Sequence, residues 1–156
     1  MPSDAFLKLD QVAGESTSAQ HPNECELLAW NWAESHATTA GAAGQRPEIA
    51  DLTFTKLVDR ASPKLLIACA RGDILGKGVL TVRRSGGSNF ILFRFLLTDV
   101  SVRSYQIGGA SGDQAATETV SLSFAKIELE YKQQGLDGNL QGTVRAGWDL
   151  KLNRPA

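Results

Sequence analysis

Most of the chain alternates apolar and polar residues with the two-residue period of a half-buried β-strand. The stretch Cys25 to Ser35, CELLAWNWAES, shows this clearly, because Leu28, Trp30 and Trp32 share one face while the other face is small. About seven such segments, rich in Val, Leu, Phe and Thr, are predicted to be strands. They are Ala5–Val12, Cys25–Ser35, Asp51–Asp59, Gly78–Arg84, Phe90–Tyr105, Glu118–Lys132 and Thr143–Asn153.

One short helix is predicted at about Pro63 to Arg71. Ser62 is a candidate N-cap, Pro63 suits the first helical position, and Gly72 can adopt the left-handed conformation that ends a helix. Leu65, Leu66, Cys69 and Ala70 lie near helical spacing, which predicts one stripe packed on the sheet. One helix among seven strands favours a β-barrel or sandwich with a flanking helix.

In each of the two longest predicted strands, the apolar residues switch between even and odd positions partway along, and the two switches lie opposite each other. In one strand the apolar residues change from Val120, Leu122 and Phe124 to Ile127, Leu129 and Tyr131, and in the other from Phe93, Phe95 and Leu97 to Val100 and Val102. A hairpin centred on the intervening loop has paired positions that sum to about 224, so Val102 faces Leu122, Val100 faces Phe124 and Leu97 faces Ile127. Two explanations are possible. In the first, the two paired strands bury one side before the change and the other side after it, which leaves apolar surface for a neighbouring copy to cover. In the second, a bulge in each strand keeps all of these residues in one core.

Charge and hydropathy argue against a nucleic-acid-binding protein and against a membrane-spanning one. Sixteen Lys and Arg against seventeen Asp and Glu, spread without blocks, lack the clustered positive charge of a nucleic-acid surface. No apolar run approaches the roughly 18 residues of a membrane helix, and no secretory leader is visible at the N-terminus. At 156 residues, one domain over 1–156 is expected.

The sequence offers no catalytic or metal constellation. His21 and Cys25 are four residues apart, but no second pair completes a tetrahedral metal set. With only His21 and His36 as bases, a Ser or Cys triad is not predicted, although an enzyme relying on one of these histidines stays open as a third interpretation. Cys25 and Cys69 are expected to be small apolar residues in a reducing compartment, and a disulfide between them stays open as an alternative. We therefore expect a protein that is not an enzyme and has no cofactor.

Two loops separate the predicted strands. Ser35 to Pro47, SHATTAGAAGQRP, is long and lacks an apolar anchor, which is typical of a functional or disordered loop. Ile107 to Thr117, IGGASGDQAAT, joins the two longest strands. The tryptophans leave two alternatives open: Trp30, Trp32 and Trp148 belong to the core with Phe54, or the tryptophans form an aromatic platform for a small ligand on a monomeric β-barrel.

An ordered set of stretches resembles the haemolysin-coregulated protein (Hcp) family, which forms the inner tube of the bacterial type VI secretion system. The set is FLKLDQVAGES, LLAWNWAES, DLTFTKLVDRASPKLLIACARG, VLTVRR, GGASG, ETVSLSFAKIELEY and GWDLKLN, in family order from residue 6 to residue 153. The resemblance implies a compact β-barrel of two packed sheets with one short flanking helix and an extended loop. Six copies would close into a ring, and rings would stack into a tube.

The resemblance also implies partners and a place of action. These are other copies of the chain, small effector proteins in the lumen, and the spike and sheath of the secretion system, with no nucleic acid and no membrane insertion. The protein would reside in the bacterial cytoplasm before firing and then leave without a signal peptide. Because the chain ends at Ala156, we expect no C-terminal toxin domain.

The resemblance assigns roles to individual positions of this chain. Asn31, with Ala29 and Ala33 on the same strand face, is similar to the lumen site that contacts effectors, where a smaller residue such as Ser is common. Two loops are similar to those through which rings stack. The residues assigned to stacking are Ser35, His36, Thr38, Thr39, Gly41, Gly44, Arg46, Gly108, Gly109 and Gly112.

Overall fold

The computed structural model describes residues 3–36, 46–84, 91–112, 115–134 and 140–156 of the chain. Strands dominate these residues and one short helix interrupts them, so the predicted mainly β class is confirmed. The elements are β1 (Ser3–Leu9), β2 (Cys25–Leu27), β3 (Ala29–Asn31), β4 (Glu34–Ser35), β5 (Glu48–Ile49), β6 (Leu52–Leu57), α1 (Ser62–Arg71), β7 (Ile74–Arg84), β8 (Ile91–Gly108), β9 (Thr117–Ser123), β10 (Lys126–Gln134), β11 (Leu140–Asp149) and β12 (Arg154–Pro155).

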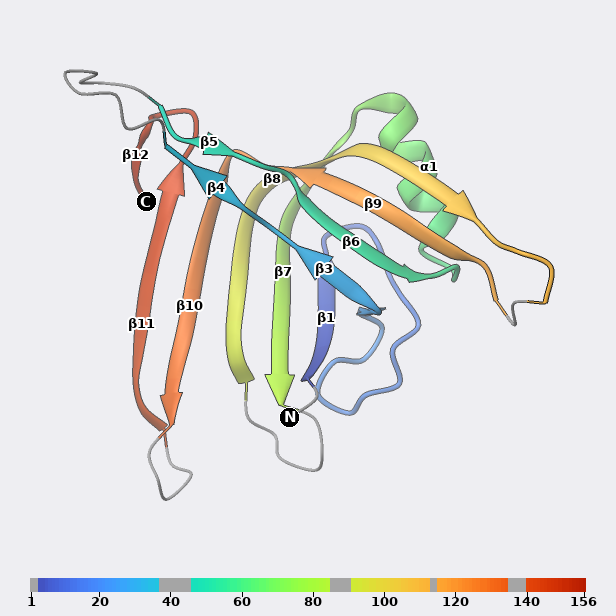
Figure 1. The fold of residues 1–156 in the computed structure, drawn as a ribbon, viewed down its shortest axis with the longest axis horizontal. Helices are drawn as coiled ribbons and strands as arrows, with labels where there is room; N and C mark the ends of the chain where they lie inside the picture. Colours follow the sequence, from blue (N-terminus) through green and yellow to red (C-terminus); the bar gives the residue numbers. More distant parts are fainter. Residues whose placement is uncertain (1–2, 37–45, 85–90, 113–114, 135–139) are drawn as a thin grey trace.

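Ten of the described strands form one continuous sheet. Its main path runs β12-β11-β10-β8-β7-β1-β2, and β3, β6 and β9 continue it from the second half of β8, while β4 and β5 pair separately. Figure 1 shows β3 in front of β1, and the chain from β3 to β4 crossing in front of β7 and the first half of β8, so the sheet folds over itself. The expected barrel of two packed sheets is therefore corrected to one folded sheet that does not close.

The chain crosses from one layer of the folded sheet to the other between β2 and β3. β2 pairs with β1, whereas β3 pairs with β6. Between them Leu28 donates its amide N–H to the Thr55 carbonyl at 2.8 Å, and its side chain is 60 % exposed. Leu28 therefore does not share a covered face with Trp30 and Trp32 as the alternation predicts, because this local break changes the register of the strand.

The core lies between the two layers of the folded sheet. Phe54 and Leu52 from β6 and Val120 and Leu122 from β9 are at most 1 % exposed, and they belong to one cluster with Leu7, Leu80 and Leu97 from the other layer. No helix in the described part of the chain has the length and apolar character of a membrane span.

Helix α1 agrees with the sequence in its span but not in every contact. It begins at Ser62, so Ala61 rather than Ser62 occupies the cap position, and the Asp59 carboxylate accepts the Ala61 N–H at 2.8 Å. Gly72 ends the helix in the left-handed conformation, with φ of 72°, as predicted. The stripe that is buried consists of Ser62, Leu65 and Ala68, whereas Leu66 is 52 % exposed. This spacing of three follows the side of the helix that packs on β8.

The switch of apolar positions in the two long strands is explained by backbone irregularities that lie opposite each other. The predicted pairs Val102 with Leu122 and Leu97 with Ile127 are confirmed. Asp99 interrupts β8 with a φ of 54°, and the opposite strand breaks between β9 and β10, where Ala125 donates to the Thr98 carbonyl at 2.9 Å. Residues on both sides of the break belong to one cluster, so the alternative with two separate cores is wrong.

Candidate assembly surfaces

A small polar face covers the layer formed by β3, β6, β9 and the second half of β8. Ala29 pairs with Thr55 and Asn31 with Thr53. The Thr53 hydroxyl lies 3.2 Å from that of Ser121, and the Thr55 hydroxyl lies 3.3 Å from that of Thr119, so these side chains share one side of the sheet. We call this surface the small polar face; its residues are Ala29, Asn31, Thr53, Thr55, Ser104, Gln106, Thr119 and Ser121. None of these eight residues is charged or aromatic.

All three sequence-predicted lumen residues are exposed. Ala29, Asn31 and Ala33 are open to solvent on the strand side opposite Trp30 and Trp32, which are half-buried against the core. The Asn31 side chain therefore lies among the hydroxyls of the small polar face, which the sequence alternation of β6 and β9 could have indicated.

A second surface is apolar and only partly covered by the chain itself. One row across the sheet consists of Ala5, Val82, Phe93, Tyr131 and Val144. Ala5 and Val82 are 7 % and 3 % exposed, whereas Tyr131 and Val144 are 47 % and 63 % exposed. The residues of this row are therefore buried on β1 and β7 but exposed on β10 and β11, although they are apolar or aromatic throughout.

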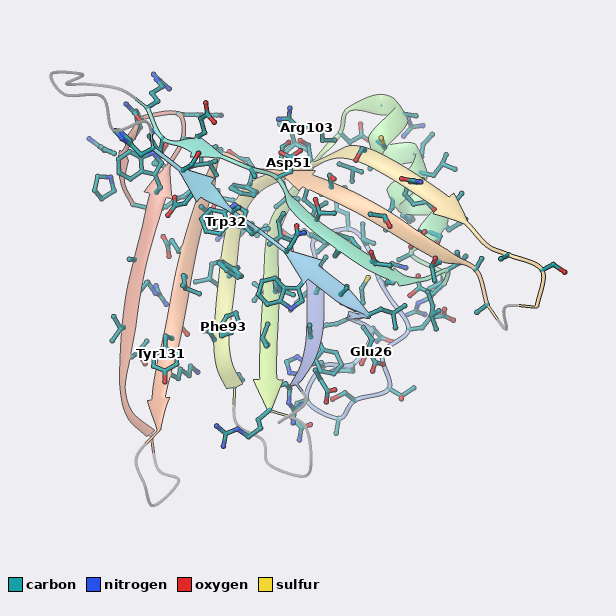
Figure 2. The ribbon with its side chains drawn as sticks, viewed as in Figure 1. Glu26, Trp32, Asp51, Phe93, Arg103 and Tyr131 are labelled. Carbon is teal, nitrogen blue, oxygen red and sulfur yellow. The ribbon has the colours of Figure 1, made fainter. Side chains whose placement is uncertain are left out.

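The neighbouring row shows the same gradient. Leu7 and Leu80 are 0 % exposed and Phe95 6 %, but Leu129 on β10 is 40 % exposed. We call Phe93, Leu129, Tyr131 and Val144 the apolar floor. Figure 2 shows Phe93 and Tyr131 on the part of the sheet that β3 and β6 leave uncovered.

Aromatic side chains hold β3 against this sheet. Trp30 packs edge-to-face on Phe93 and Phe95, with ring centroids 5.8 and 5.7 Å apart, and Trp32 packs on Phe95 in the same way at 5.7 Å. Trp32 and Trp148 line a shallow cavity of about 230 Å³, and Phe54 is buried in the core. The cavity is smaller than the roughly 300 Å³ at which pockets for small ligands begin.

The opposite side of the same hairpin is charged. Arg94 and Arg145 both donate hydrogen bonds to the Glu130 carboxylate, whose side chain is 3 % exposed. The hydrogen bonds from Arg145 and Arg94 hold the pKa of Glu130 below its usual value, although burial opposes this. The hairpin therefore has one apolar side and one charged side.

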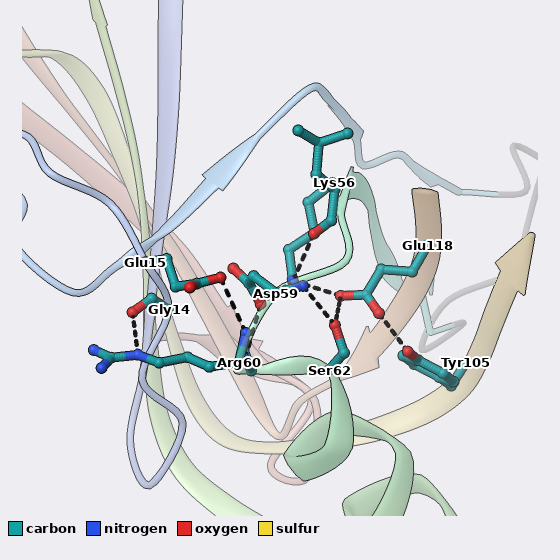
Figure 3. Close-up of polar contacts among 10 residues, drawn as sticks. Gly14, Glu15, Lys56, Asp59, Arg60, Ser62, Tyr105 and Glu118 are labelled. Carbon is teal, nitrogen blue, oxygen red and sulfur yellow. Dashed lines mark hydrogen bonds and ion pairs between the residues drawn. The ribbon is translucent and has the colours of Figure 1, made fainter. Parts of the chain in front are cut away.

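A buried polar cluster lies under the start of α1 and was not predicted from the sequence (Figure 3). Lys56 Nζ lies 2.7 Å from Asp59 Oδ1 and 2.5 Å from Glu118 Oε1, and the Ser62 hydroxyl donates to Glu118 Oε1 at 3.1 Å. The Tyr105 hydroxyl donates to the other Glu118 oxygen. Lys56 and Glu118 occupy inward positions of otherwise apolar strands, a signal that sequence analysis could have used.

Three groups in or near this cluster have raised pKa values. Burial alone would lower the pKa of Lys56, but hydrogen bonds and charges from Asp59 and Glu118 outweigh burial and raise it. Burial and the Glu118 hydrogen bond raise the pKa of Tyr105 to about 12. Burial raises the pKa of the nearby Cys25 thiol to about 11. The cluster fixes the start of α1 to β6 and β9.

The residues examined for chemistry are not brought together. His21 is stacked on Phe6 with ring centroids 4.5 Å apart, and its Nδ1 lies 3.1 Å from Glu24 Oε2, whereas His36 is exposed at the end of β4. Cys25 is buried and free, and Cys69 is free and half-buried. In the described residues, no three His, Cys, Asp or Glu side chains are grouped as metal ligands.

The described residues of the two loops assigned to ring stacking are exposed at two separate places in the fold. Ser35, His36 and Arg46 are exposed next to β4 and β5, and Arg46 donates to the Leu150 carbonyl at 3.3 Å. Gly108, Gly109 and Gly112 are exposed at the turn that follows β8. The remaining predicted residues, Thr38, Thr39, Gly41 and Gly44, lie outside the described residues.

Comparisons with known proteins agree in sequence and in fold. A family model described as "Type VI secretion system effector, Hcp" matches residues 6–131. Protein hcp1 of Pseudomonas aeruginosa is 36% identical over 159 residues, which cover 98% of each chain. The crystal structure of Hcp1 from Salmonella typhimurium is similar with a TM-score of 0.84, 34% identity and 100% coverage of both chains. The structure of a type six secretion system protein is similar with a TM-score of 0.91 and 30% identity, covering 99% of this chain and 100% of that chain.

Proposed function

Because the chain belongs to the Hcp family and is a structural component of the type VI secretion system, we propose that six copies close into a ring and that rings stack into the inner tube. Its role is then structural rather than catalytic, it needs no cofactor, and residues 1–156 act as one domain. The protein is exported from the bacterial cytoplasm when the system fires, and its other partners are the spike, the sheath and small effector proteins.

The exposed apolar floor carries the proposal of a ring. Tyr131 and Val144 continue rows that are buried elsewhere in the same sheet, yet they are 47 % and 63 % exposed. A contiguous apolar surface of this kind on a soluble chain marks a protein interface. A ring is a head-to-tail assembly in which each copy offers two different surfaces, so every floor is covered by a different part of the next copy.

The small polar face is proposed to line the lumen and to contact effectors. Asn31 and Ala29 lie on this exposed face, whose side chains are uncharged, and Ala33 is exposed just beyond the end of β3. Such a surface suits a passage, because it offers hydrogen bonds to a cargo protein without strong electrostatic attraction to the wall. The amide of Asn31 extends farther than the neighbouring Thr and Ser hydroxyls and would therefore influence which cargo is retained.

Ring stacking is assigned to the loops next to β4 and β5 and after β8. Their proposed contact residues are Ser35, His36, Thr38, Thr39, Gly41, Gly44, Arg46, Gly108, Gly109 and Gly112. The described members of this set are exposed, which supports a role in contacts between rings.

Light scattering on the purified protein tests the ring. We expect a mass six times the 16.7 kDa of one chain, and a charged Val144→Asp variant should lose this mass because a carboxylate would be buried in the interface. The matched control is Leu66→Asp, which places the same charge on the exposed side of α1, where Leu66 is 52 % exposed. This variant should keep the mass of the ring. A wild-type mass of one chain at every concentration would contradict the proposal.

A monomeric β-protein that binds a small ligand is the second candidate. The observation in its favour is that Trp32 and Trp148 line the same cavity. The family membership favours the ring.

A further inference from the structure

A β-bulge in β8 adds one residue to the layer that carries the small polar face. Val102 pairs with Leu122 on β9 and Ser104 pairs with Ser121, so one step along β9 corresponds to two steps along β8. Arg103 is the extra residue of this bulge. Bulges often redirect a side chain at a functional site, because the alternation of faces breaks at the extra residue.

The bulge places Arg103 on the side of the small polar face. The Ser101 hydroxyl lies 2.6 Å from that of Ser123, and alternation along β9 puts Ser123 on the same side as Ser121. Alternation along β8 then puts Arg103 on the side of Ser101, while the extra residue keeps Ser104 on that side as well. Two consecutive residues of β8, one of them cationic, therefore share the side of the hydroxyls in this layer.

Asp51 neutralises Arg103 without enclosing it. Asp51 comes directly before β6 and by alternation shares the side of Thr53. Arg103 Nε lies 3.0 Å from Asp51 Oδ2, and Figure 2 shows the two residues together at the end of the layer where β6 begins. The Arg103 side chain is 66 % exposed and that of Asp51 is 25 % exposed. The group that this pair presents to solvent is therefore mainly the guanidinium.

The terminal nitrogens of Arg103 are left for a second partner. The ion pair uses Nε, and among the described residues the guanidinium has no other contact. The two terminal NH2 groups form a planar fork that matches the two oxygens of a carboxylate. Because Asp51 offsets the charge of Arg103, recognition at this fork depends on directed hydrogen bonds more than on long-range attraction.

Arg103 lies next to the row of residues that contains Asn31. This row crosses the layer through Asn31, Thr53, Ser121 and Ser104, and Arg103 precedes Ser104. None of the eight residues of the small polar face is charged, so Arg103 adds a charge-sensitive contact at the margin of that face. A protein that covers the row containing Asn31 would reach both kinds of contact.

An acidic protein surface fits this arrangement better than a nucleic acid. A phosphate backbone is bound by clustered cations, whereas this chain spreads sixteen Lys and Arg among seventeen Asp and Glu. The one guanidinium in this place is also offset by Asp51. A single oriented fork beside hydroxyls and an amide suits a folded surface on which individual Asp or Glu side chains lie between uncharged polar groups.

We propose that Arg103 selects cargo by binding carboxylates of Asp or Glu side chains that face the small polar face, while Asp51 neutralises and orients the guanidinium. This inference rests on the proposed ring and lumen and names the class of cargo surface that is retained there. Six copies would supply six such forks around the lumen, so a cargo with several exposed carboxylates gains from multivalent binding.

Peptide binding to the purified ring tests this selection. The probes are a short peptide in which Glu alternates with Ser, the same peptide with Gln in place of Glu, and a single-stranded oligonucleotide of equal charge, each carrying a neutral fluorophore. Fluorescence anisotropy measures the dissociation constants. We expect the wild-type ring to bind the Glu peptide at least about tenfold more tightly than the Gln peptide or the oligonucleotide.

Two variants of Arg103 separate the fork from the charge. Arg103→Lys keeps the charge but loses the two parallel donors, and Arg103→Gln loses both, so each should bind the Glu peptide about tenfold more weakly and the Gln peptide as before. The matched control is Arg71→Lys at the exposed end of α1, which should bind both peptides as the wild type does. Light scattering checks that each variant keeps the mass of six chains. The comparison of the two peptides on the wild-type ring needs no variant, so it decides the matter even where a substitution at Arg103 disturbs assembly.

Salt dependence tests the part of Asp51. Asp51→Asn leaves the guanidinium without its neutralising charge, so the affinity for the Glu peptide should fall more steeply with sodium chloride than in the wild type. An unchanged salt dependence would overturn the part given to Asp51.

The remaining outcomes separate this inference from the proposed function. Equal binding of the Glu and Gln peptides by a wild-type ring would overturn the selection and leave the ring and the lumen role of Asn31 in place. Undiminished affinity in Arg103→Lys would overturn the fork, and tighter binding of the oligonucleotide would overturn the choice of protein carboxylates. A wild-type chain that is monomeric in light scattering would overturn the ring and this inference together.

Discussion

Lys56 Nζ lies 2.5 Å from Glu118 Oε1, and the two side chains are 1 % and 0 % exposed. The pair joins neighbouring strands β6 and β9 through directly opposed positions. Because the Ser62 hydroxyl also donates to Glu118, the pair connects β6 and β9 to the start of α1. A buried ion pair is weak evidence of net stabilisation, but removing one partner leaves the other uncompensated.

Lys56→Met should therefore lower the free energy of unfolding by about 3–5 kcal/mol, because it leaves the Glu118 carboxylate buried without its cation. Replacing both partners, with Lys56→Met and Glu118→Leu, should recover much of this loss. Urea unfolding of the two variants and the wild type measures the difference. A double variant that is less stable than Lys56→Met would show that the pair itself, rather than the buried charge, governs stability.

Alkaline pH should weaken the fold through the same cluster. The pKa of Tyr105 is raised to about 12, that of Cys25 to about 11, and that of Lys56 above its usual value. In each case the folded state holds its proton to higher pH than the unfolded state, so the stabilisation is complete below about pH 9 and is lost as pH rises toward 12. Melting temperatures between pH 8 and 11.5 should fall steeply.

Tyr105→Phe provides the control for that profile. It removes one titrating group while keeping the ring, so the fall in melting temperature above pH 10 should become shallower than in the wild type. An identical slope in both proteins would remove Tyr105 from the explanation.

Acidic pH should act through Glu130. Hydrogen bonds from Arg145 and Arg94 keep its pKa below the usual value, so the stabilisation is present above the ordinary glutamate pKa and is lost as pH falls through the lower folded value. Glu130→Gln should lower the melting temperature at pH 7 and reduce its dependence on pH between 3 and 5. Equal acid dependence in the variant and the wild type would contradict this assignment.

Trp30→Ala should destabilise the monomer by about 3 kcal/mol, near the lower end for a large aromatic truncation because Trp30 is half-buried. The loss follows from its edge-to-face contacts with Phe93 and Phe95. Chemical unfolding measures it. A variant of unchanged stability with only altered ligand binding would instead favour a binding site at Trp30.

Asn31→Gln should leave ring assembly intact and reduce retention of a co-expressed effector, because the longer amide displaces the cargo surface from the small polar face. Co-purification measures cargo, and light scattering measures the ring. Thr55→Ser, on the same face, is a matched control that shortens a side chain and should keep the cargo. Equal recovery of every cargo with Asn31→Gln would argue against a lumen role.

Local pattern determined much of the fold in advance. The two-residue alternation placed the long strands, and the hairpin register pairing Val102 with Leu122 and Leu97 with Ile127 followed from the position of the loop. Pro63 and Gly72 located the helix, because they act on the backbone at their own positions. The small and bulky sides of the strand around Asn31 were also visible, since alternation fixes which residues share a face.

Tertiary structure alone decided how those faces are used. The sequence left two explanations for the change of parity, and only the break at Asp99 and Ala125 showed that one core continues across it. Val144 is as apolar as Val82 in the same row, and Tyr131 continues that row with an aromatic ring, but β3 and β6 cover one end of the sheet and not the other. Period and residue type specify which side of a strand is apolar, whereas exposure depends on distant segments that fold across it. The buried pairing of Lys56 with Glu118 is likewise a contact between positions 62 residues apart, which local pattern cannot specify.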